Sequence, residues 1–184
     1  GTSRVQEQPM ARFPLDALEE LYRHMEWADA TVWQAALAHA PAARDVRLRD
    51  LLLHLHTVQY GFLHVWTDTA ITWPKPEDFP DIASVLRWSR PVYAPSRAFL
   101  GGLDSTALER PIVMPWASEL TQHLGREPEV PTLGESIFQV TSHSTYHRGQ
   151  VNARLREIGG EPPPVDFIAW IWFGKPDPAW QETA

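Results

Sequence analysis

The chain has 184 residues, of which 43% are hydrophobic, enough for one globular domain with a core of its own. Its formal net charge of −7 argues against non-specific nucleic-acid binding, and the absence of cysteine excludes disulfides, thiolate metal ligands and a cysteine nucleophile. No apolar run approaches the about 20 residues of a membrane span, and no secretory signal is visible, so we expect a cytoplasmic protein. Residues 1–9 are interpreted as an expression remnant or a disordered segment, 10–173 as a single domain and 174–184 as a polar tail.

Two long amphipathic helices are predicted in the first half of the chain. Between Phe13 and Ala40 apolar residues recur at helical spacing, with Pro14 suited to the first turn. A second helix is expected from Val46 to Thr69. The inner stripe of this second helix is expected to consist of Leu51, Leu55, Val58, Phe62 and Val65.

Three histidines lie in the second predicted helix, and their angles to the inner stripe differ. His54 lies about 60° from the centre of the stripe, whereas His56 and His64 lie well over about 100° away. We therefore expect His54 to point inward and the other two to point outward. The inward position suits a metal ligand, and it equally suits a buried, hydrogen-bonded core histidine.

The middle of the chain is less regular. Residues 72–80 hold three prolines and are expected to form a loop. A third helix is predicted over residues 81–100, with a kink or break at Pro91 and Pro95, because proline lacks a backbone donor and clashes with the preceding turn. For residues 104–131, a small hairpin and an extended loop fit the sequence equally well.

The fourth predicted helix begins at Thr132, where Glu135 three residues later matches the capping-box pattern, and it runs to Ile158. It carries His143 and His147, which lie one turn apart on the same face. Two imidazoles so placed can hold a metal ion from one side, and a third ligand must come from another element. Histidines at this spacing also occur simply as packed or exposed residues.

A short aromatic helix is predicted at residues 166–172, after three consecutive prolines. Four long helices, one short helix and few strand signals together predict an all-α bundle.

Three short patterns in these elements are informative in combination. They are His143-Ser-Thr-Tyr-His147-Arg-Gly-Gln150, the histidine of Leu51-Leu-Leu-His54-Leu, and Met25-Glu-Trp27-Ala-Asp29 followed far downstream by two glycines and three prolines. With this combination, from about Met10 to Trp172, the chain resembles the DinB/YfiT-like family of metal-dependent enzymes.

The resemblance implies an antiparallel four-helix bundle with a short extra C-terminal helix. It implies a divalent metal ion held by His54, His143 and His147. Imidazole ligands suit both zinc and nickel, so either ion is expected. The resemblance further implies a homodimer and a thiol-dependent S-transferase or isomerase that acts on a small electrophile, with a low-molecular-weight thiol as cosubstrate. A metal-dependent hydrolase and a non-catalytic metal- or small-ligand-binding bundle remain open as alternatives, and no catalytic side chain is assigned.

Four further side chains are candidates for the surroundings of the metal. Gln150, Gln59 and Tyr146 could contact the ligand histidines, because a ligating imidazole normally has a hydrogen-bond partner for its second nitrogen. Arg148 could bind an anionic group of the substrate or form a surface ion pair. Gln59 stands where the family commonly has glutamate, and Asp29 stands where it commonly has asparagine.

Overall fold

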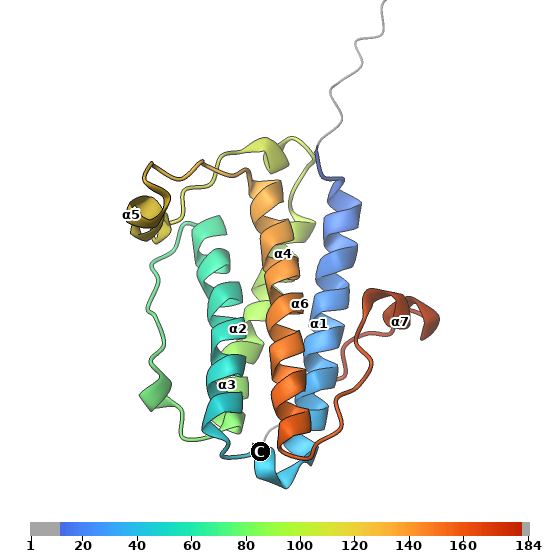
Figure 1. Cartoon of the computed structure of the whole chain (residues 1–184). Helices are drawn as coiled ribbons and strands as arrows, with labels where there is room; N and C mark the ends of the chain where they lie inside the picture. Colours follow the sequence, from blue (N-terminus) through green and yellow to red (C-terminus); the bar gives the residue numbers. More distant parts are fainter. Residues whose placement is uncertain (1–11, 182–184) are drawn as a thin grey trace, which may run out of the picture.

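The computed structural model describes residues 12–181 of the chain. Four helical arms form the body of the protein. The arms are α1 (Leu15–Ala38), α2 (Val46–Trp66), α3 (Ile82–Ser89) continued by α4 (Tyr93–Gly101), and α6 (Leu133–Glu157). In Figure 1, α1 and α6 run in one direction and the other two arms in the opposite one, because the connection after α2 returns along the bundle before α3 begins. The all-α bundle predicted from the sequence is confirmed. Residues 1–9 lie outside the described part of the chain.

The helix ends lie close to the predicted positions because capping residues act locally. The Thr132 hydroxyl accepts a hydrogen bond from the Glu135 N–H (3.2 Å), and the Glu135 carboxylate accepts one from the Thr132 N–H (2.8 Å). The Asp45 carboxylate caps α2 by accepting a hydrogen bond from the Leu48 N–H (2.7 Å). The third arm breaks at a 3₁₀ turn that contains Pro91, as predicted for a residue without a backbone donor.

The connection between α4 and α6 contains no β-strand. It consists of short helical turns, among them α5 (Thr121–Leu124), and one antiparallel bridge between Pro111 and Thr132. Residues 112–131 therefore leave the bundle and return to the same point as a loop, which in Figure 1 lies beside the adjacent ends of α2 and α6.

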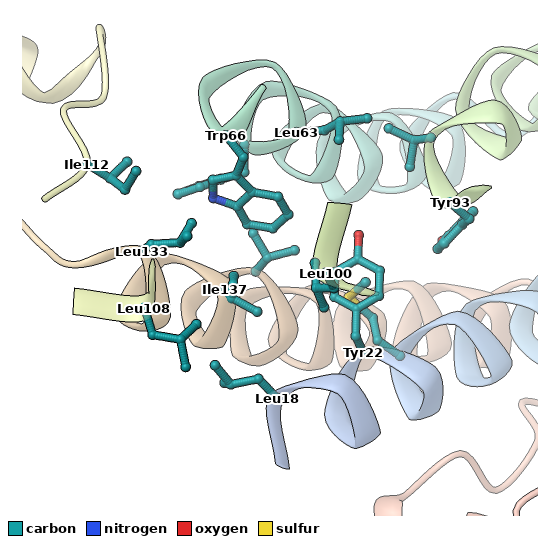
Figure 2. Close-up of a cluster of buried hydrophobic side chains, with 14 residues drawn as sticks. Leu18, Tyr22, Leu63, Trp66, Tyr93, Leu100, Leu108, Ile112, Leu133 and Ile137 are labelled. Atoms are coloured by element: carbon teal, nitrogen blue, oxygen red, sulfur yellow. The ribbon is translucent and has the colours of Figure 1, made fainter. Parts of the chain in front are cut away.

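All four arms contribute to the buried hydrophobic core. Figure 2 shows part of it, where Leu18 of α1, Trp66 of α2 and Ile137 of α6 converge with Leu100 of α4. Each is at most 3% exposed, and burial of a side chain of this size stabilises the fold by about 1.5–3 kcal/mol. The Trp66 indole N–H donates to the Ser136 hydroxyl (2.9 Å), which ties α2 to α6 within the core.

The buried face of α2 differs from the predicted one. Leu52 and Gln59 face the core, whereas Leu51 is only half-buried, so the buried face is rotated by about 80° from the expected stripe. As a result His56 is 1% exposed and His54 is exposed, which makes the expected orientations of both residues wrong. Leucines at 51, 52, 53 and 55 allow several apolar stripes, and packing against α1 and α6 selects among them.

The predicted C-terminal helix is α7 (Phe167–Trp172), which packs against α1 through the buried Trp170. The chain then returns to the bundle, where the Trp180 ring lies 5.0 Å from that of Tyr93 and its indole N–H donates to Glu26 (3.2 Å). The proposed boundary at residue 173 stays a prediction. Within the described residues, no helix combines the length and the apolar character that a bilayer span requires.

Candidate metal centre

Three histidines from two helices meet where α2 packs against α6. His54 comes from α2, and His143 and His147 come from α6; each offers a ring nitrogen, and the three nitrogens lie within 4.8 Å of one another. The Nε2 atoms of His54 and His147 are 3.2 Å apart. The ring planes are inclined at 49°, 51° and 71°, so no two rings stack flat.

This spacing fits a cation shared by the three rings. Imidazole nitrogens that are about 2.0–2.1 Å from one ion lie about 2.9 Å apart at a right angle and about 3.4 Å apart at the tetrahedral angle. The distance of 3.2 Å between His54 and His147 falls within this range. The Nδ1 atom of His143 is buried without a hydrogen-bond partner among the described residues, as expected for an atom whose partner lies outside the chain.

The surroundings of the cluster favour neutral imidazoles. Burial, followed by repulsion from His147 and His54, lowers the pKa of His143 to about 4. Partial desolvation of the otherwise exposed His54 ring, followed by repulsion from His147, also lowers the pKa of His54. Since a metal ion binds the lone pair of an unprotonated ring nitrogen, both side chains are available as ligands at neutral pH.

Gln150 and Tyr146 lie beside His147. The Gln150 Oε1 atom is 2.7 Å from Nδ1 of His147 and can only accept, so Nδ1 donates to it and Nε2, which faces His54, is the ring nitrogen left to bind an ion. This is the contact expected of a residue that orients a ligand. The Tyr146 ring meets His147 edge-on with centroids 4.9 Å apart.

Arg148 and Gln59 lie behind the cluster, in the core. Arg148 is 2% exposed and donates to Asp29 (2.6 Å), so it neither binds an anion in the groove nor forms a surface ion pair. The Gln59 amide donates to Asp29 (2.8 Å) and Ser144 (3.1 Å), and its side-chain oxygen pairs with His56 (2.8 Å), so its hydrogen bonds within the described residues are made to side chains other than the three histidines. The roles expected for these two side chains are therefore corrected, because both point away from the site.

His56 completes this buried network. The Trp33 indole can only donate, so it donates to Nε2 of His56 (2.9 Å). Nδ1 of His56 then donates to the side-chain Oε1 atom of Gln59 (2.8 Å). The Tyr93 hydroxyl donates to the other end of the network at Asp29 (2.7 Å). Sequence patterns did not indicate this network, because polar residues at helical spacing usually mark an exposed face.

A cavity of about 1070 Å³ lies next to the histidines. It is bounded by α2, by α6 and by residues 112–131, with His54 and His143 in its lining. Its size is that of a small-molecule site, and apolar side chains make up much of its surface. The sequence did not reveal it, because the loop that closes it has no periodic pattern.

Comparison with known proteins agrees with this geometry and with the sequence patterns. The family model described as "DinB family" matches residues 10–179. A curated relative, "Protein DinB" of Bacillus subtilis (strain 168), is 35% identical over 48 residues, which cover 26% of this chain and only 28% of that protein. Because the family model spans almost the whole sequence, the chain belongs to the DinB family.

Proposed function

We propose that this chain is a metal-dependent enzyme in which His54, His143 and His147 hold one divalent ion, zinc or nickel. The supporting observation is the convergence of three ring nitrogens within 4.8 Å, two of them 3.2 Å apart. Three protein ligands leave coordination positions open, which is typical of catalytic zinc sites, whereas structural sites are closed by four ligands. Imidazole suits both zinc and nickel.

The reaction proposed is thiol-dependent S-transfer or isomerisation of a small electrophile. A divalent ion held by imidazoles supplies Lewis acidity, which makes a water or thiol nucleophile available at neutral pH. The serines beside His143 are not available as covalent nucleophiles: Ser144 is buried and hydrogen-bonded to Gln59, and Ser142 donates to a backbone carbonyl, while the sequence contains no cysteine. A cosubstrate therefore has to bring the nucleophile, while Gln150 orients His147 and the cavity positions the electrophile.

Metal analysis of untagged protein tests the ligand assignment. We expect about one equivalent in the unmodified chain, following from one three-histidine cluster, and almost none in His54→Ala, His143→Ala or His147→Ala. His64→Ala, on the same helix as His54 but outside the cluster, is the matched control; it is preferred to His56→Ala because His56 is buried. Full metal content in His54→Ala would contradict the three-histidine site.

Turnover of model electrophiles with a panel of small thiols, with and without chelator, tests the reaction. We expect activity that requires both the metal and the thiol. Activity that survives complete removal of the metal would reject the mechanism. Retained metal without turnover by any thiol would instead support a hydrolase or a binding protein.

We also propose a homodimer, which rests on membership of the DinB family alone. Light scattering at micromolar concentration should give twice the chain mass of 20.9 kDa. A monomer mass would remove this proposal.

A further inference from the structure

The residues that line the cavity include histidines, aromatic side chains and carboxylates. On α6, Glu135, Gln139 and His143 follow one another at intervals of four residues and form a line about 12 Å long. On α2, which runs in the opposite direction, His54 lies at the His143 end and Phe62 lies two turns away. A ligand in this groove would reach from the histidine cluster to the loop of residues 112–131.

Three aromatic side chains, Phe62, Trp73 and Trp116, line the cavity. The Trp116 ring lies edge-on to Phe62 (5.4 Å between centroids) and to Trp73 (5.6 Å). A Cβ atom at Gly61 would lie only 2.8 Å from the Trp73 ring, so the missing side chain lets Trp73 lie against α2. These walls suit a flat apolar group.

The charged residues of the lining, apart from the histidines, are all acidic. Glu119, Glu127, Glu129 and Glu135 line the cavity, and neither lysine nor arginine does. Glu129 pairs with Arg126 and Glu135 with Arg12, and both arginines stand outside the lining. In the described part of the chain, Glu119 and Glu127 form no ion pair with a basic side chain. The nearby Arg126 guanidinium pairs with Glu129 and donates to the Glu127 backbone carbonyl (3.4 Å), so one positive charge faces three carboxylates and the loop end of the cavity keeps a net negative charge.

We propose that the cavity binds an elongated small molecule with a flat apolar body and a positively charged end, such as an ammonium group. This inference rests on the proposed function, because the molecule is taken to be the electrophilic substrate of that site. Its reacting end would lie at His54 and His143, its body among Phe62, Trp73 and Trp116, and its cation toward Glu119 and Glu127. Anions of the same shape would be repelled from the acidic end.

Three probes of equal length test the charge preference: phenylbutylammonium, phenylbutanol and phenylbutyrate. Their affinities for the full-length, metal-loaded protein are measured by titration calorimetry. At low salt the ammonium probe should bind about 5–10-fold more tightly than the alcohol, and the carboxylate more weakly than the alcohol; at about 0.5 M salt the differences should shrink. An ammonium probe that binds no more tightly than the alcohol, or failure of all three to bind, would overturn the proposal.

Two sets of variants separate the charge from the apolar walls. Glu119→Gln/Glu127→Gln should abolish the preference and leave affinity for the alcohol unchanged, whereas Glu77→Gln/Glu161→Gln, an equal charge change outside the cavity, should preserve it. Trp116→Ala should weaken the three probes by a similar factor. A preference that survives in the Glu119/Glu127 variant would contradict the assignment of these two carboxylates.

The same titration in His54→Ala distinguishes this inference from the proposed function. The variant should lose its metal and retain the preference for the ammonium probe, because the acidic end of the cavity is unchanged. If the unmodified protein prefers the ammonium probe but contains no metal and shows no turnover, the proposed function alone is rejected. Normal metal content and turnover without the preference would reject this inference alone.

Discussion

His54 and His56 lie two residues apart on α2, yet their side chains enter contrasting environments. His56 is buried, and both of its ring nitrogens have hydrogen-bond partners, one from Trp33 and one on Gln59. His54 is exposed, and its Nε2 atom faces another imidazole nitrogen, that of His147. The two clusters to which they belong therefore differ in how completely their polar atoms are paired.

The difference distinguishes a structural network from the proposed metal site. In the buried network the Asp29 carboxylate is neutralised by Arg148 and also accepts from Gln59 and Tyr93, so α1, α2, α4 and α6 are held together. In the groove, the ring nitrogens of three imidazoles converge within 4.8 Å of one another. Such a group is unfavourable alone and is stabilised by a cation. The buried ion pair thus supports the helices that carry the proposed metal site, and ring nitrogens that face one another mark the proposed site itself.

The largest effect is expected from breaking the buried network. Arg148→Met should lower the free energy of unfolding by about 3–5 kcal/mol, because the Asp29 carboxylate would stay buried without a counter-charge. Urea unfolding of metal-free protein measures this loss. Asp29→Asn/Arg148→Met should recover part of it, since asparagine still accepts from Tyr93; a loss below about 1 kcal/mol in the single variant would contradict the structural role.

The converse is expected of His54→Ala. Metal affinity should fall by more than the about 10–100-fold typical of a lost outer partner, because a ligand is removed. The free energy of unfolding of the metal-free protein should change by only about 0.5 kcal/mol, since the side chain is exposed. Competition with a chromophoric chelator and metal-free unfolding give the two values. Destabilisation comparable to that of Arg148→Met would remove the distinction between the clusters.

Gln150→Leu sharpens the comparison, because Gln150 supports His147 without being a ligand. Metal affinity should fall by about 10–100-fold as the His147 ring loses its fixed orientation. Gln122→Leu, an equal change at an exposed position outside the cavity lining, serves as the matched control and should bind metal normally. Equal affinities of the two variants in a chelator competition would show that Gln150 does not orient the ligand.

The smallest effect concerns pH and the buried histidine. Burial lowers the pKa of His56, so its protonated form is favoured in the unfolded chain. Stability is therefore expected to fall as pH drops below the ordinary histidine pKa of about 6.5, by at most about 1.4 kcal/mol per pH unit for this one group. Metal-free His56→Gln, although less stable overall, should lose stability less steeply with falling pH than the unmodified chain. Parallel curves of unfolding free energy against pH would show that His56 does not contribute to this pH dependence.

Local sequence determined most of the helix boundaries. The Thr132–Glu135 capping box and the break at Pro91 act through neighbouring backbone groups and needed no knowledge of the rest of the chain. The pairing of His143 with His147 likewise follows from helical spacing alone. These features were predictable because their physics spans only a few residues.

Tertiary packing decided which polar side chains belong to the site. Apolar residues surround much of α2, so only contact with α1 and α6 could turn His56 inward and bring His54 to the α6 histidines. The same packing buried Arg148 and Gln59, whose types alone suggested exposed or site-facing roles. The cavity arises where the unpatterned loop of residues 112–131 returns across α2 and α6, because the bridge between Pro111 and Thr132 closes its base; this contact joins residues that are distant in sequence.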